Sequence, residues 1–163
     1  MARNRRASRE DEPPTADPRT VALRLLTRRD YTTSEIERKL TDRGYEADAI
    51  ADVIQSLTRA GLLDDRRVAA AHIRTSSRIK SRGKLRIARE LEARGISRTL
   101  VRELTAGLSA DDESASLARV MARMRVPATM DRQTRQRIFG RLLRRGFSPD
   151  AISKALRFQD QEE

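Results

Sequence analysis

Apolar residues recur along most of the chain at the three- and four-residue spacing of an amphipathic helix. The first helix is predicted to begin at Asp17-Pro18, because aspartate caps free N–H groups and proline is tolerated at the first helical position. Ile36 and Leu40 lie four residues apart, on one face of a second helix, and Gly44 follows where that helix must end. The pattern therefore predicts helices joined by sharp turns.

This arrangement occurs three times at a constant interval of 51 residues, in the segments EIERKLTDRGYEADAI, RIARELEARGISRTLV and RIFGRLLRRGFSPDAI. Each segment has an apolar pair four residues apart, then an Arg-Gly dipeptide and a further apolar residue. Glycine can adopt the left-handed conformation that ends a helix, and the apolar residue after it can pack back on that helix. We predict structural turns at Gly44, Gly95 and Gly146.

A further helix is expected before each of these pairs. A capping box could start the helix after the first of them, formed either by Thr32 with Glu35 or by Ser34 with Glu37. In the middle segment, Val68, His72 and Ile79 fall on one face at helical period. The three additional helices are predicted at roughly 18–29, 65–80 and 112–125.

The predicted fold class is all-α, with three tandem three-helix, helix-turn-helix-like modules that form an elongated helical repeat. The opening segment lacks apolar periodicity and contains a Pro-Pro pair, so we expect a disordered arm there. The expected division is an arm at 1–16, modules at 17–61, 62–109 and 110–158, and a tail at 159–163.

Composition limits the chemistry. Only 37% of the 163 residues are hydrophobic and 3% are aromatic, so each module can form only a thin aliphatic core. With no cysteine and a single histidine, His72, we expect no disulfide, metal or cofactor and assign His72 to packing. Asp64 and Asp65 could in principle serve metal-assisted hydrolysis, but helix capping explains them, and we expect no enzyme. No segment is apolar enough to span a membrane, and we expect a cytoplasmic protein.

Positive charge is concentrated in the middle module. The net charge is +11, and residues 61–109 contain 12 Lys or Arg against 5 Asp or Glu. No acid lies between Asp65 and Glu90. Such a run can be a merely solvated face, but the lack of interspersed acids favours a surface for a polyanion. The module has no aromatic residue for base stacking, so contact with a nucleic-acid backbone is expected. The predicted surface comprises Arg67, Arg74, Arg78, Lys80, Arg82, Lys84, Arg86 and Arg89.

The residues from about Ala22 to Arg157 resemble the RecX family. The most specific part is residues 61–96, where Gly61-Leu62-Leu63-Asp64-Asp65 is similar to the family's junction between its first two modules. The central signature is matched by Arg82-Gly83, Ile87, Glu90, Leu91 and Gly95-Ile96. The chain departs from the family at Val68 and His72, where aromatic residues are common.

The resemblance implies a regulator that binds the groove of the RecA recombinase filament on DNA and inhibits RecA activity. It therefore implies roles in recombination, DNA repair and the SOS response. An alternative is a stand-alone DNA-binding protein that contacts the backbone of single-stranded or double-stranded DNA through its helix-turn-helix-like modules. We expect a monomer, because the sequence has no heptad seam. Which module contacts RecA and which contacts DNA stays open at this point.

Overall fold

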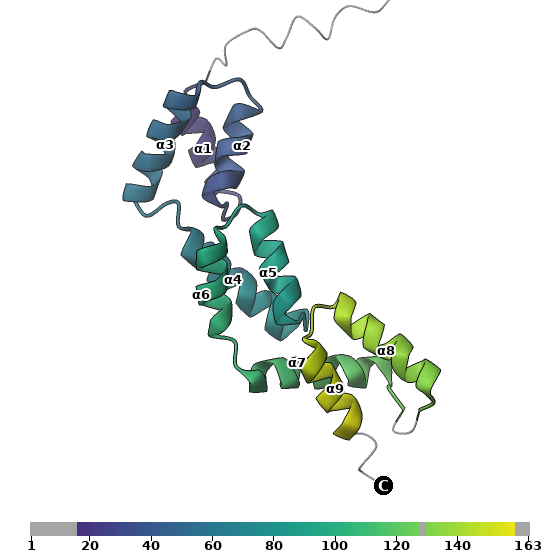
Figure 1. Ribbon diagram of the computed structural model, residues 1–163. Coiled ribbons are helices and arrows are strands. Elements are labelled where there is room, and N and C mark those ends of the chain that lie inside the picture. The colour runs from purple at the N-terminus through teal and green to yellow at the C-terminus, as the bar shows by residue number, and fades with distance from the viewer. Residues whose placement is uncertain (1–15, 128–129, 159–163) are drawn as a thin grey trace, which may run out of the picture. The chain divides into compact units, whose positions relative to one another are not determined.

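The computed structural model describes residues 16–127 and 130–158, so the predicted arm and tail lie almost entirely outside the described residues. Every regular element in these residues is helical and none is a strand, as Figure 1 shows. The chain divides into two compact units, Met1–Val68 with Arg94–Ile96, and Ala69–Ala93 with Ser97–Glu163. The contacts given below lie within one unit or the other.

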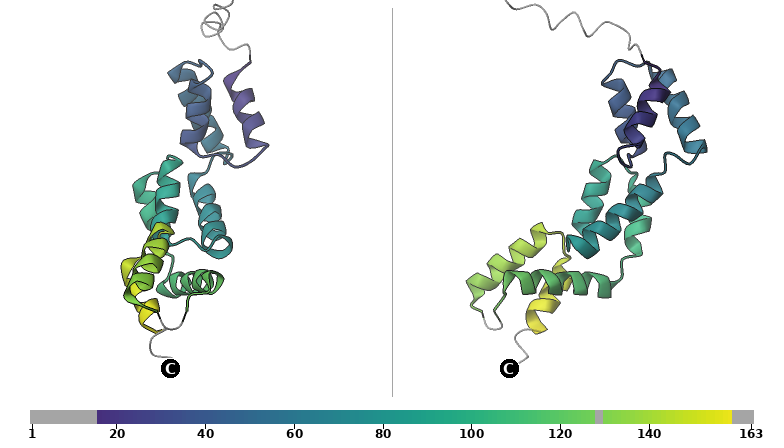
Figure 2. Two further views of the ribbon diagram at one scale, coloured as in Figure 1. Left: turned by 90° about the vertical axis from the view of Figure 1, so that its right-hand side faces the viewer. Right: turned by 180° about the vertical axis from the view of Figure 1, so that it is seen from behind.

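The helices follow the predicted order of three groups of three. The first module has α1 (Pro18–Leu26), α2 (Thr33–Thr41) and α3 (Ala47–Arg59), which pack pairwise on one another. The second has α4 (Asp65–Arg74), continued by η2 (Thr75–Ile79), then α5 (Lys84–Ala93) and α6 (Arg98–Ala106). The third has α7 (Ala110–Met124), α8 (Arg132–Arg144) and α9 (Pro149–Phe158), with α9 against both α7 and α8 (Figure 2). The all-α fold of three tandem three-helix modules is thus confirmed.

Side chains cap the starts of several helices, α1 and α2 among them. The Asp17 carboxylate accepts a hydrogen bond from the Thr20 N–H at 2.9 Å, and Pro18 occupies the first helical position. Of the two possible capping boxes, the structure contains the one between Thr32 and Glu35. These local signals fixed the starts of α1 and α2.

The three repeated glycines adopt the backbone conformation that a left-handed turn requires. The φ angles are +80° at Gly44, +82° at Gly95 and +84° at Gly146. After the first and last of them, the N–H of Tyr45 donates to the Leu40 carbonyl and that of Phe147 to the Leu142 carbonyl. These hydrogen bonds satisfy carbonyl groups at the ends of α2 and α8.

Some helix boundaries differ from the predicted ones. The first helix ends at Leu26 rather than near residue 29, and α7 begins at Ala110 because Ser109 caps it. The largest difference is in 65–80, where the α-helix ends at Arg74 and continues as a π-helix. A π-turn holds more residues than an α-turn, so the faces after it shift. The prediction that Ile79 shares the buried face of Val68 was wrong, since Ile79 is 69% exposed.

Small, mainly aliphatic cores hold the first and third modules, each with one buried aromatic side chain. The first buries Ile36, Leu40 and Leu57, and the third buries Leu142 and Phe147. Burial of such a side chain stabilises the fold by about 1.5–3 kcal/mol, so each core offers only a modest total. No helix in the described part of the chain is long and apolar enough to cross a membrane.

Candidate functional site

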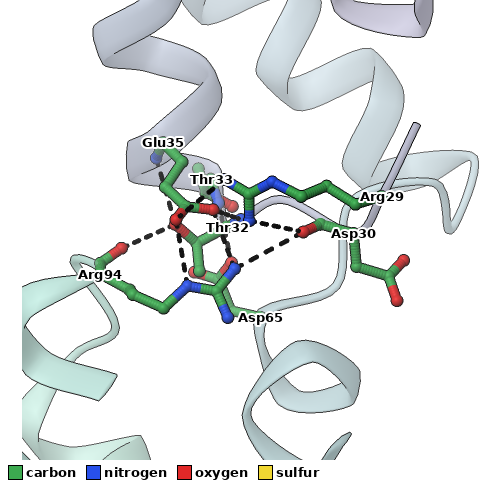
Figure 3. A network of polar contacts seen from close by, with 7 residues as sticks. All are labelled: Arg29, Asp30, Thr32, Thr33, Glu35, Asp65 and Arg94. Atoms are coloured by element: carbon green, nitrogen blue, oxygen red, sulfur yellow. Dashed lines mark hydrogen bonds and ion pairs between the residues drawn. The ribbon is translucent and has the colours of Figure 1, made fainter. Parts of the chain in front are cut away.

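In the first compact unit, the Arg94-Gly95 turn lies against the start of α2, and we call this contact the first junction (Figure 3). The Thr32 hydroxyl donates to the Arg94 carbonyl at 2.7 Å, and the Ser34 hydroxyl donates to the Gly95 carbonyl at 3.4 Å. A Cβ atom at Gly95 would lie 2.3 Å from that of Ser34, so the turn requires glycine for proximity as well as for its φ angle.

An ion pair completes the first junction. Arg94 donates from Nε and Nη2 to the two carboxylate oxygens of Glu35, at 3.0 and 2.9 Å, while the Thr32 N–H donates to the same carboxylate. Burial favours the neutral form of Glu35, but the hydrogen bonds from Arg94 and Thr32 outweigh it and hold the pKa of Glu35 below its usual value. Asp65 also contributes a carboxylate, which accepts from the Thr33 N–H at 2.8 Å. The positive charge at the first junction is therefore balanced by nearby carboxylates.

The second compact unit contains an equivalent contact, the second junction, displaced by the repeat interval of 51 residues. Here the N–H of Gly83 donates to the Arg145 carbonyl at 2.9 Å, and the N–H of Leu85 donates to the Gly146 carbonyl at 3.0 Å. Backbone N–H groups thus replace the hydroxyls of Thr32 and Ser34. They can approach because Gly83 has no side chain, since a Cβ there would lie 2.2 Å from the backbone of Gly146.

Six cationic side chains line a cavity of about 400 Å³ beside the second junction. We call it the basic pocket. Three of its residues belong to the predicted surface, and the other three come from the end of α8 and its turn, which the sequence reasoning did not include. The signal was available, because Arg145 occupies the repeat position of Arg94. The lining residues are Lys80, Arg82, Arg86, Arg141, Arg144 and Arg145.

Glu90 partly neutralises the basic pocket. Arg82 donates from Nη1 to its carboxylate at 2.5 Å and Arg86 donates from Nε at 2.9 Å. His72 Nε2 lies 3.0 Å from the same carboxylate, so His72, expected only to pack, also has a polar partner. Burial opposes ionisation of Glu90, but the hydrogen bonds from Arg86, His72 and Arg82 lower its pKa. Although no acid lies between Asp65 and Glu90 in the sequence, Glu90 itself binds two of the cations, which the run of basic residues does not indicate.

The other predicted surface residues lie elsewhere. Arg67 belongs to the first unit, where its guanidinium donates to the Gly61 carbonyl and lies 3.5 Å from an Asp30 carboxylate oxygen. In the second unit, the charge of Arg78 lowers the pKa of Asp112, after the larger effect of the Ser109 hydrogen bonds. Lys84 lines a small cavity with Asp112 and Glu113, whereas Arg74 and Arg89 are exposed.

The two aspartates weighed for hydrolysis are engaged in capping. Asp64 accepts from the Arg67 N–H at 2.9 Å and Asp65 from the Thr33 N–H. In the described residues, no three His, Cys, Asp or Glu side chains are grouped so that they could hold a metal ion. The arrangement therefore offers charge for binding an anion and no catalytic constellation at these residues.

Comparison with known proteins agrees with this architecture. Three consecutive segments match the family descriptions "RecX, first three-helix domain" at residues 19–57, "RecX, second three-helix domain" at 64–104 and "RecX, third three-helix domain" at 111–156. The chain is similar to "Regulatory protein RecX" of Pelodictyon phaeoclathratiforme, 37% identical over 142 residues, which are 85% of this chain and 86% of the relative. The corresponding protein of Halorhodospira halophila is 35% identical over 150 residues, 89% of each chain.

The crystal structure of RecX from Lactobacillus salivarius has the same fold, with a TM-score of 0.78 at 24% identity, covering 88% of this chain and 95% of that one. The relatives are named as regulatory proteins, which supports a regulatory role. With all three domains matched in order along most of its length, this chain belongs to the RecX family.

Proposed function

We propose that this protein inhibits RecA by binding along the groove of the RecA filament on DNA. The observation that carries the proposal is the match of all three domains, in order, to the family whose members are named regulatory proteins. The proposal includes the cytoplasmic location and the monomeric state expected from the sequence. It requires no catalytic residue in this chain, because inhibition follows from binding.

The charge distribution supports a partner that contains nucleic acid. A net charge of +11 attracts a polyanion through the release of its counterions. Several modules on one chain can also add avidity, because contacts made after the first are intramolecular. The surface proposed for these contacts combines the exposed cations Arg74, Arg78 and Arg89, and Lys84, with the basic pocket.

The test is the rate of single-stranded-DNA-dependent ATP hydrolysis by the cognate RecA, with this protein added below and up to an equimolar ratio. We expect inhibition well below one protein per recombinase, because each bound regulator affects a filament of many subunits. The inhibition should persist when DNA is in excess, which distinguishes action on the filament from masking of free DNA. No inhibition at any ratio would contradict the proposal.

The alternative function is DNA binding without RecA, and the observation that favours it is the concentration of cations in the basic pocket. Firm binding to bare DNA together with no effect on ATP hydrolysis would establish that alternative. Inhibition that vanishes when DNA is in excess would favour it as well.

A further inference from the structure

The two junctions use the same two carbonyls of an Arg-Gly turn as acceptors, but the charges around them differ. At the first junction, Arg29 and Arg94 both approach the Glu35 carboxylate. The corresponding residues at the second junction, 51 positions later, are Lys80 and Arg145, so both positive charges are retained. The carboxylate is not retained, because the position of Glu35 is occupied by Arg86.

The other acids of the first junction are also missing from the second. Asp30 corresponds to Ser81, and Asp65, which accepts from the Thr33 N–H, corresponds to Ser116. Three carboxylates are thus replaced by two serines and an arginine. The second junction therefore keeps the cations of the salt-bridge network but lacks these three carboxylates, and its Arg86 pairs with Glu90 instead.

Four cations of the basic pocket form no ion pair with any acid in residues 16–127 and 130–158: Lys80, Arg141, Arg144 and Arg145. Among the described residues, Glu90 pairs with Arg82, Arg86 and His72. Six cations facing one carboxylate repel one another, and an anion bound among them would remove that repulsion.

We propose that the basic pocket is a phosphate-binding site that takes a backbone phosphate of a DNA strand. Guanidinium groups bind phosphate through paired N–H donors in a planar fork, and five of the six lining side chains are arginines. The phosphate would supply the negative charge that the Glu35 carboxylate supplies at the first junction. A strand phosphate, rather than a nucleobase, fits because none of the six lining residues is aromatic or carries a hydrogen-bond acceptor in its side chain.

This inference deepens the proposed function, on whose nucleic-acid partner it rests, by assigning a strand contact to the junction between α5 and α8. It is tested without RecA, so that its failure can be told from a failure to inhibit ATP hydrolysis. The measurement is the affinity for a labelled single-stranded oligonucleotide over a range of salt concentrations, for variants checked for helicity by circular dichroism.

The first variant is Arg141→Gln with Arg144→Gln and Arg145→Gln, which removes three positive charges from the basic pocket. We expect affinity to fall at least about tenfold and the slope of log affinity against log salt to become shallower, since each strand phosphate contact contributes about 0.7 to it. The matched control is Arg102→Gln with Arg123→Gln and Arg132→Gln, which removes the same charge from exposed positions outside the pocket. Equal losses in the two variants would overturn the proposal.

A second variant tests the charge pattern at constant net charge. Arg86→Glu with Glu90→Lys places an acid and a base where the first junction has Glu35 and Lys39. We expect strand affinity to fall, because the new carboxylate competes with phosphate for Arg145. A folded variant with unchanged affinity would overturn the proposal, and if this variant fails to fold, the glutamine variant and its control decide.

Two probes distinguish the source of the phosphate. An oligonucleotide with neutral methylphosphonate linkages should bind the wild type and the pocket variant equally weakly. Inorganic phosphate at millimolar concentration should displace the natural strand no more than chloride of equal ionic strength does. Binding of inorganic phosphate that the pocket variant abolishes, together with an affinity for the natural strand that the same variant leaves unchanged, would identify a site for free phosphate and overturn the assignment to a strand.

Discussion

The first and second junctions share the same Arg-Gly turn, but the side chains around the turn differ in charge. In both, a left-handed Arg-Gly turn presents two carbonyls to donors at the start of a helix. At the first junction the arginine of the turn meets a buried carboxylate, so its charge is used within the fold. At the second junction the equivalent arginine lines a pocket of cations. Since backbone hydrogen bonds already secure the packing of the second junction, the arginine of its turn is not needed for an ion pair like that of Arg94 with Glu35.

The largest effect on stability is expected from Gly83→Val, which disrupts the backbone contact of the second junction. The added side chain would overlap the Gly146 backbone, whose nearest atoms would lie 2.2 Å from the new Cβ. We expect the free energy of unfolding to fall by about 3 kcal/mol, measured by urea denaturation. Gly107→Ala is the control, because the nearest atom to its Cβ, the Leu104 carbonyl oxygen, is at 3.5 Å. Equal stability of the two variants would contradict the close approach.

A smaller loss of unfolding free energy is expected from Glu35→Gln, which removes the ion pair of the first junction. Arg94 would lose its charged partner while its side chain stays only 22% exposed. Loss of one member of a fully buried pair costs about 3–5 kcal/mol, and we expect about 2 kcal/mol here because both groups keep some contact with water. A double-mutant cycle with Arg94→Met measures the coupling. Additive losses would show that the ion pair does not stabilise the fold.

The ionisation of Glu35 and Glu90 gives a smaller effect, a dependence of stability on pH. The pKa values of Glu35 and Glu90 are both lowered in the folded protein. Their stabilisation is therefore present above the unfolded pKa of about 4.3 and is lost as the pH falls through the folded values. Denaturation at a series of pH values should show stability falling on acidification, with a weaker dependence in Glu35→Gln. The same slope in both proteins would contradict the role of Glu35.

The smallest effect on stability is expected from the glutamine variant of Arg141, Arg144 and Arg145. These side chains are exposed and form no ion pair with an acid among the described residues. The free energy of unfolding should therefore change by less than about 0.5 kcal/mol. The same measurement on Arg94→Gln should show a clear loss, because Arg94 holds Glu35. A similar loss of unfolding free energy in the two variants would contradict the electrostatic difference between the junctions.

Much of the fold could be predicted from local sequence signals. Asp17 before Pro18, the Thr32 and Glu35 capping box and the repeated glycines act on neighbouring residues, so their effects could be anticipated without knowing the packing. The π-helix at Thr75–Ile79 could not, since an α-helical period gives no sign of an inserted wide turn. Its consequence was the wrong assignment of Ile79 to a buried face.

The candidate site was only half predictable. Lys80, Arg82 and Arg86 were included because the run of cations marks them, whereas Arg141, Arg144 and Arg145 lie among residues of a less basic module. Arg67 was grouped with the others by proximity in sequence, yet its partners are Gly61, Leu62 and Asp30 in the other compact unit. Sequence proximity was therefore a poor guide to which charges act together.

By itself the sequence determined the helices, the interval of the repeat, the turns at Gly44, Gly95 and Gly146 and the excess of positive charge. Each of these depends on residues near one another in the chain, or on a simple sum. Only the tertiary structure decided that Arg94 meets Glu35, 59 residues away, and that Arg145 lines a pocket with Arg86. The physical reason is that electrostatic energy depends on distance in space, and packing sets that distance.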